Sequence, residues 1–254
     1  MVSEVPDSLR PLRRRAQLAV LGLIAVVVAD LVLIWSDLRT IDLMSRLLDE
    51  PATILVELDA LEANDDREAV VALVYFAALI AAIVLFIRWF HAAYANLRAL
   101  KQPALRYRTG WAIGSWFVPF LNLWRPKQIA NDIWRGSDPD APAFTQAAWP
   151  TLPITPLLGA WWAAWIIGSL LSNAVGRAIW RADAAEDIRS AARFEIFTTG
   201  VEILAAVLAV AVVWKLTARQ ELRAQRVAAE SAHRGTAPLQ YDGRDVAGSS
   251  GQPG

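Results

Sequence analysis

The sequence predicts an all-α fold, a polytopic bundle of transmembrane helices, from three observations. Hydrophobic residues make up 56% of the 254 residues. Four stretches are apolar over close to the 20 or so residues that a helix needs to cross a bilayer. Charged residues gather between these stretches rather than within them. The four predicted spans are residues 16–35, 69–87, 157–175 and 199–214.

The first span follows a short basic segment, residues 1–15, which holds four Arg and two acidic residues. Positive charge beside a span favours the cytoplasm, so the N-terminus is expected inside. The apolar run is longer than the core of a secretory signal. No small-residue cleavage pattern follows Trp35, so an uncleaved helix is expected.

An acidic loop, residues 37–68, follows the first span and is expected outside. It holds ten acidic residues against three Arg. On both sides of Pro51, apolar residues recur at steps of three and four, among them Ile54 and Leu55, as on amphipathic helices. We therefore expect two short helices that rest on the outer membrane face, and the favoured interpretation is that they only cap the bundle.

The charges beside the later spans predict that both termini are cytoplasmic. Residues 88–110 contain five basic residues and no acid, and the region after residue 214 is again basic. Five prolines make residues 137–156 an irregular connector, and Pro156 suits the first turn of the third span. The membrane domain is then 16–220, followed by a cytoplasmic tail, 221–254, that is largely disordered. Residues 217–232 are expected to form a charged helical extension, and disorder is expected from His233 onward.

Between the second and third spans, residues 111–134 form a segment that is not expected to cross the membrane. Its apolar part, Trp111–Leu123, has only 13 residues and contains Pro119 and Asn122. A stretch of this length is more typical of a re-entrant or interfacial segment. A crossing would also bring the number of spans to five and place the basic C-terminus outside.

This region also holds the densest group of unusual residues. Proline removes backbone donors, tryptophan favours the headgroup depth, and asparagine can bind the backbone groups that a broken helix frees. A plug that holds the helices together is favoured over a ligand, lipid or partner site. The candidate functional block consists of Arg88, Trp89, Asn96, Trp111, Trp116, Pro119, Asn122, Trp124, Arg125 and Pro126.

A family resemblance is carried by the run Gly110–Pro126, GWAIGSWFVPFLNLWRP, together with Trp89 and Asn96. It resembles the signature of the bacterial membrane family that contains domain of unknown function 4328. The likeness is strongest over residues 88–135 and extends over 70–220. It implies a multi-span protein of the bacterial cytoplasmic membrane, and it implies no activity, cofactor or substrate.

Two carboxylates lie inside predicted spans, Asp30 in the first and Glu202 in the fourth. The threading places both in the outer half of the membrane at similar depth. A charge there is costly and usually faces a partner or a cavity. Arg177 and Asn173, near the outer end of the third span, are the candidate partners. The acids are interpreted as part of a buried ion pair that locks helices, or of a partly solvated rim, with a proton or cation site as the alternative.

The third span also carries small residues at strict four-residue spacing. Small side chains on one face let another helix approach closely, within the bundle or at a homodimer contact. This stripe consists of Ala160, Ala164, Gly168, Ser172 and Gly176.

Several chemistries find no support in the sequence. There is no cysteine and there are only two histidines, so disulfides, thiolate sites and a histidine metal cage are not expected. Phosphate loops, nucleophile elbows and zinc-protease motifs are absent, which predicts no enzyme activity and no cofactor. No separate basic domain suggests nucleic acid. The cytoplasmic basic residues are explained by topology, with anionic headgroups as a possible lipid partner.

Two functional hypotheses remain. The leading one is a non-enzymatic membrane scaffold that binds a protein or lipid through its cytoplasmic block. The alternative is a small oligomeric transporter or channel that uses Asp30 and Glu202 in a polar path. The expected partners are the lipid bilayer, a second copy of the chain or an unidentified protein.

Overall fold

The computed structural model describes residues 9–50, 58–100, 105–140, 152–179 and 184–236, and within them it contains helices and no strand. Four helices each contain a stretch that is long and apolar enough to cross a membrane. The predicted fold class, a helical bundle with four spans, is therefore confirmed. These helices are α1 (Leu12–Asp49), α2 (Leu58–Ala99), α5 (Pro156–Ile179) and α6 (Ala185–Thr236).

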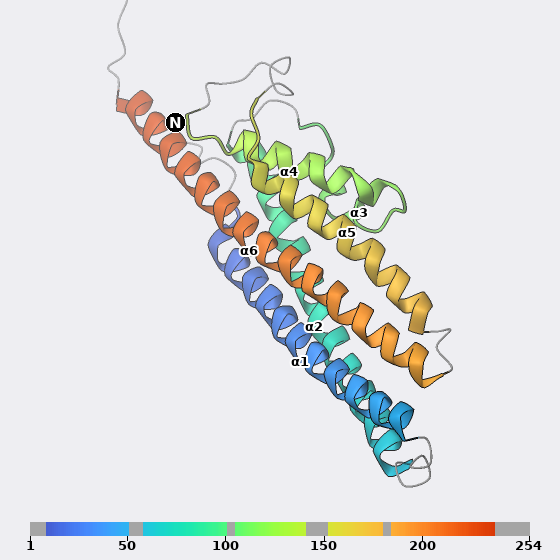
Figure 1. Ribbon diagram of the computed structural model, residues 1–254. Coiled ribbons are helices and arrows are strands. Elements are labelled where there is room, and N and C mark those ends of the chain that lie inside the picture. The colour runs from blue at the N-terminus through green and yellow to red at the C-terminus, as the bar shows by residue number, and fades with distance from the viewer. Residues whose placement is uncertain (1–8, 51–57, 101–104, 141–151, 180–183, 237–254) are drawn as a thin grey trace, which may run out of the picture.

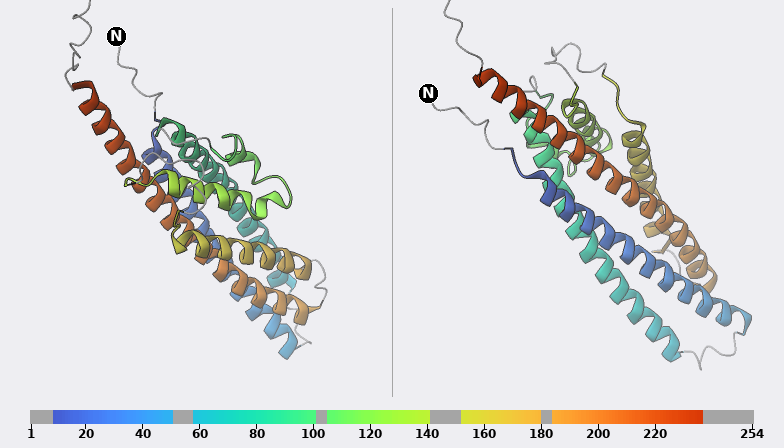
Figure 2. Two further views of the ribbon diagram at one scale, coloured as in Figure 1. Left: turned by 90° about the horizontal axis from the view of Figure 1, so that it is seen from above. Right: turned by 90° about the vertical axis from the view of Figure 1, so that its left-hand side faces the viewer.

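The four long helices lie in the order α2, α1, α6, α5 (Figures 1 and 2). Helix α1 packs along both α2 and α6, and α5 packs along α6. Helices α2 and α5 make no comparable contact with each other, so they form the two edges of the arrangement.

Both ends of the described chain lie at the same end of the bundle, as an even number of crossings requires (Figure 1). We call this the terminal end, because α1 begins and α6 ends there. At the opposite end, the hairpin end, α1 and α5 end and α2 and α6 begin.

The expectation of two short helices on the membrane surface is wrong for the described part of residues 37–68. Residues 37–49 continue α1 and residues 58–68 begin α2. Their apolar faces pack on each other and on α6, where Leu43, Met44 and Leu47 meet Leu61 and Ile188. Burial between helices thus replaces the predicted burial in the membrane surface. The expected contribution of residues 54 and 55 lies outside the described residues.

The predicted break between the second and third spans is present. It contains the four-residue helix α3 (Trp111–Gly114), the 3-10 turn η2 (Leu121–Leu123) and α4 (Arg125–Gly136), with Phe120 at a positive φ of 63°. These elements are too short to cross a membrane. Because α3 and α4 contact α2, and α4 contacts α5, the broken segment bridges the two edges at the terminal end. The main buried cluster lies beneath it.

Helix α6 continues well beyond the fourth span. It is helical without interruption over 52 residues, to Thr236, so the helical extension predicted for residues 217–232 is present and ends a few residues later than predicted. The extension is held by the end of α4 and the residues that follow it. Arg219 forms an ion pair with Asp138 at 2.8 Å and lies 4.4 Å from the ring centre of Trp134, and Arg223 donates to the Pro139 carbonyl at 3.3 Å.

Single thiols will show on which side of the membrane each end lies. Because the chain has no cysteine, Ile154→Cys and Ala184→Cys each carry one thiol, at opposite ends of α5. We expect a membrane-impermeant maleimide to label Ala184→Cys in intact cells, and Ile154→Cys only after permeabilisation. The reverse pattern would show that the charge-based orientation is wrong.

Candidate ligand groove

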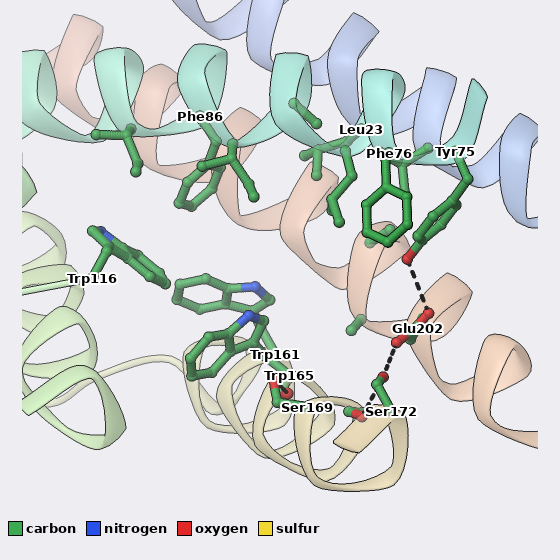
Figure 3. A pocket seen from close by; sticks show the side chains of 18 of the residues that line it. Leu23, Tyr75, Phe76, Phe86, Trp116, Trp161, Trp165, Ser169, Ser172 and Glu202 are labelled. Atoms are coloured by element: carbon green, nitrogen blue, oxygen red, sulfur yellow. Dashed lines mark hydrogen bonds between the residues drawn. The ribbon is translucent and has the colours of Figure 1, made fainter. Parts of the chain in front are cut away.

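A groove of about 630 Å³ lies between the two edge helices, α2 and α5 (Figure 3). Its floor is formed by Leu23 and Val26 of α1 and by Ala205 and Ala206 of α6. Trp116, from the broken segment, lines it at the terminal end. The volume lies within the range of small-molecule sites in proteins.

One end of the groove is aromatic. Phe86 of α2 and Trp161 and Trp165 of α5 converge there with Trp116 (Figure 3). The Trp116 ring is edge-on to Trp165 at 5.6 Å and to Phe86 at 5.8 Å between centroids. Such edge-to-face pairs are favourable, so these walls have a defined shape. This end can take an apolar or flat ligand group.

The broken segment that supplies Trp116 is itself held in place. The guanidinium group of Arg125 lies 4.0 Å from the ring centre of Trp111 and 5.0 Å from that of Tyr107, which is cation–π geometry. The indole N–H of Trp162, on α5, donates to the Leu123 carbonyl at 3.1 Å. That bond satisfies a backbone group of the kind that a broken helix frees.

Two members of the predicted block, Trp89 and Asn96, are buried inside the bundle. Trp89 is fully buried, and its N–H donates to the Thr217 hydroxyl at 3.0 Å. Asn96 was expected to bind the broken segment, but its amide pairs instead with the backbone of Arg10, at 3.0 and 3.2 Å, and with Gln220 at 3.2 Å. Both residues join α2 to other parts of the chain and are not available to a partner.

The remaining members of the block do not form one surface either. Arg88, Pro119 and Trp124 are exposed, whereas Pro126 is buried at the start of α4. Asn122 was expected to bind freed backbone groups, but its side chain forms no hydrogen bond with the described residues. The block is thus divided between bundle packing, the groove wall and an exposed tip.

The other end of the groove is polar and centres on Glu202 of α6. One carboxylate oxygen accepts a hydrogen bond from the Tyr75 hydroxyl at 3.3 Å, and the other pairs with the Ser172 hydroxyl (Figure 3). The Ser172 hydroxyl also lies 2.9 Å from the Gly168 carbonyl. Gly168 lies against Glu202, since an added Cβ there would be at van der Waals distance, 3.5 Å, from the Glu202 Cγ.

The structure brings Asp30 and Glu202 together but leaves out their predicted partners. Asp30 is fully buried, and Glu202 is close enough to act on it electrostatically. Arg177 is exposed and forms no ion pair with either acid, and Asn173 donates to the Ser169 carbonyl at 2.7 Å instead. The favoured interpretation, an ion pair between these acids and Arg177 that locks the helices, is therefore wrong.

The small-residue stripe of α5 meets α6 in its middle part. Gly168 and Ser172 contact Glu202, and Ala164 is buried. Ala160 is exposed, and a Cβ at Gly176 would meet no atom within 4 Å. The stripe thus serves packing within the bundle over about two turns, and the homodimer contact stays a prediction.

Sequence reasoning missed Tyr75 and Phe86, which line the groove from α2. Both look like ordinary aromatic residues of a lipid-facing span. Tyr75 did offer a signal, because it is the only tyrosine within the four predicted spans. A buried tyrosine hydroxyl needs an acceptor, which Glu202 supplies.

Comparisons with known proteins identify the family segment. A family model described as domain of unknown function (DUF4328) matches residues 52–218. The match extends from just before α2 into α6, and it includes every lining residue of the groove except Leu23 and Val26. No curated protein and no solved structure matches the chain.

Proposed function

The chain belongs to the DUF4328 family, and because the family segment holds nearly the whole groove, we propose that this membrane-embedded protein binds a lipophilic cation there. The ligand has an apolar body, which occupies the aromatic end, and a positively charged group, which pairs with Glu202. The observation that carries the proposal is the position of this carboxylate, the one acidic group among the described lining residues, at the polar end of the groove and opposite its aromatic end.

Glu202 is held by hydroxyl groups rather than by a cation. Both of its carboxyl oxygens pair with hydroxyl groups, those of Tyr75 and Ser172. Within the described residues, no Lys or Arg forms an ion pair with Glu202. A carboxylate at membrane depth without a protein cation is complementary to a cationic ligand.

The aromatic walls suit the rest of such a ligand. Tryptophan faces attract cations as well as apolar groups, and three tryptophans line the groove. Phe76 and Ile83, which line the groove from α2, are 58% and 43% exposed. In a bilayer these side chains meet lipid tails, so the groove is reached from the membrane. This supports a ligand that partitions into lipid before it binds.

Binding of tetraphenylphosphonium to the purified full-length protein tests the proposal, with tryptophan fluorescence or calorimetry as the readout. We expect Glu202→Gln to weaken binding at least tenfold, about 1.4 kcal/mol. Ala205→Trp, which fills the groove floor, should abolish binding.

The matched control for the filling variant is Val207→Trp, which adds the same side chain on an exposed face of α6 outside the groove. It should bind like the unmodified protein. Neutral triphenylphosphine oxide should bind weakly to all variants. Equal affinity for the charged and neutral probes, or equal loss in the two tryptophan variants, would refute a cation site in the groove.

The two functions predicted from sequence rest on different parts of this structure. Transport of the cation is the extension of groove binding, and it predicts that Glu202→Gln abolishes flux of the probe into vesicles. Partner or lipid binding rests on the exposed tip of the broken segment, where Phe117 is 67%, Phe120 75% and Trp124 46% exposed. Its test is a triple serine variant of this tip, which should lose a bound partner and retain the probe.

A further inference from the structure

Three helices of the bundle each carry two polar residues that are seven residues apart in the sequence. Seven residues correspond to nearly two helical turns, so the members of each pair share one face. The pairs are Asp30 and Asp37 on α1, Glu68 and Tyr75 on α2, and Glu195 and Glu202 on α6.

The three faces meet inside the bundle. Asp30 interacts electrostatically with Glu202, and Asp37 with Glu195 and Glu68. Glu195 in turn lies within electrostatic reach of Glu68 and Glu202. Five carboxyl groups therefore form one connected cluster, which begins at the groove and continues toward the hairpin end.

Asp30 occupies the most unusual position in this cluster. It is 0% exposed, and neither of its carboxyl oxygens has a hydrogen-bond partner. It lies within electrostatic range of Glu202 and of Tyr75, and the Tyr75 hydroxyl donates to Glu202 rather than to Asp30. Of two neighbouring acids, one thus has hydroxyl partners and the other has none.

Protein cations do not neutralise the cluster. Within the described residues, none of the five carboxylates forms an ion pair. Arg67 is nearby, but its guanidinium donates to Ser36 at 3.0 Å, Thr40 at 3.0 Å and Asn64 at 2.6 Å. The positive charge of Arg67 acts on the Asp37 carboxyl group electrostatically, without an ion pair.

A buried carboxylate that lacks both a cation and a donor is strongly disfavoured, and a second negative charge beside it adds to the penalty. A bound metal ion or a bound proton would neutralise this negative charge. The described residues contain no group of three acidic or histidine side chains that could hold a metal ion. A proton needs only one carboxyl oxygen, and Asp30 has two that are unoccupied by donors.

We propose that Asp30 and Glu202 form a proton-binding pair in which Asp30 carries the proton and Glu202 carries the charge. The pair sits where the cluster meets the groove. One consequence of this pair rests on the proposed function. A cation that pairs with Glu202 adds positive charge near Asp30. The Asp30 O–H then releases its proton to the solvent. Charge then balances, because one cation enters as one proton leaves.

Infrared spectroscopy of the full-length protein in bilayers tests the pair without any ligand. A protonated carboxyl group gives a C=O stretching band that a carboxylate lacks. At neutral pH we expect this band in the unmodified protein and a weaker band in Asp30→Asn, since Asp37 is a second buried aspartate of the cluster. Asp42→Asn is the matched control, since Asp42 lies on α1 and is exposed in an ion pair with Arg46. It should retain the band.

A measurement on the unmodified chain covers the case in which Asp30→Asn does not fold. With aspartate labelled by ¹³C, the band should shift, which assigns it to an aspartic acid. Absence of a shifting band at neutral pH overturns the proposal. A band that disappears when Na⁺ replaces N-methylglucamine, a hydrophilic organic cation, at fixed pH also overturns it, because a metal ion then occupies the site.

Proton release tests the consequence separately. Tetraphenylphosphonium added to the protein in unbuffered solution should acidify it by up to one proton per bound cation, and Asp30→Asn should release none. If the band is present but the probe does not bind, the proposed function fails and the proton pair stands. If the probe binds without release, the pair stands and its coupling to the groove is refuted.

Discussion

Replacement of Gly22 by leucine is expected to separate α1 from α2 and to be among the most destabilising changes in the chain. A Cβ at Gly22 would lie 3.0 Å from the Ala82 Cα and 3.2 Å from a Leu85 methyl group. The Ala82 Cα is backbone, so it cannot move away unless the helix moves. Overpacking of this kind typically costs about 1–3 kcal/mol, and a full leucine should exceed that range.

The matched control is Gly200→Leu on α6, where an added Cβ would meet no atom within 4 Å. That variant should be as stable as the unmodified protein or slightly more stable, since leucine favours helix over glycine by up to about 1 kcal/mol. The free energy of unfolding in mixed micelles is the measurement. Equal stability of the two variants would show that α1 and α2 do not touch at Gly22.

A second substitution, in α2, tests whether the stability lost at Gly22 can be recovered. In the milder variant Gly22→Ala, a second change of Leu85→Ala removes the methyl group that the added Cβ would meet at 3.2 Å. The double variant should recover part of the lost stability, and a double-mutant cycle will measure the coupling. Additive effects would place these residues on separate surfaces.

Truncation of Trp89 to alanine should cost about 3–5 kcal/mol, the usual range for a large buried aromatic residue. Trp89 is fully buried, and its ring lies 5.4 Å from Phe86 between centroids. The control is Trp214→Ala on α6, because Trp214 is 42% exposed. We expect unfolding in micelles to show little change there, and a similar loss at both positions would contradict the assigned core.

The hydrogen bond of Trp89 can be separated from its packing. Trp89→Phe keeps an aromatic ring but removes the N–H that donates to Thr217. The expected loss for the bond is about 1 kcal/mol. Combination with Thr217→Val should cost less than the sum of the two single changes, whereas strict additivity would mean that the bond contributes nothing.

The membrane class and the number of spans were predictable because bilayer thickness sets a simple length and polarity requirement. The faces of the helices were not predictable by the same reasoning. Lipid and protein interior are both apolar, so a span shows little difference between its two sides. In α2, Leu73 and Ile80 are 71% and 61% exposed, while Val71 and Phe86 of the same span are buried.

The polar residues show a similar limit. Asp30 and Glu202 were recognisable, because acids are rare inside spans. Their neighbours were not, since the search looked for a cation and the structure supplies the hydroxyl groups of Tyr75 and Ser172. The seven-residue spacing was visible in the sequence. This spacing indicates a cluster of acidic residues only when the three helices are known to face one another.

The uninterrupted length of α6 has a mechanical consequence. Glu202 lies 17 residues after the first residue of this helix and 34 residues before its last, about 26 Å and 51 Å at 1.5 Å per residue. A helix that tilts as a rod about this point moves its C-terminal end twice as far as its N-terminal end. Helix α6 therefore has the proportions of a lever with its fulcrum beside Gly168, and any small tilt about that point would be amplified at the distal arm.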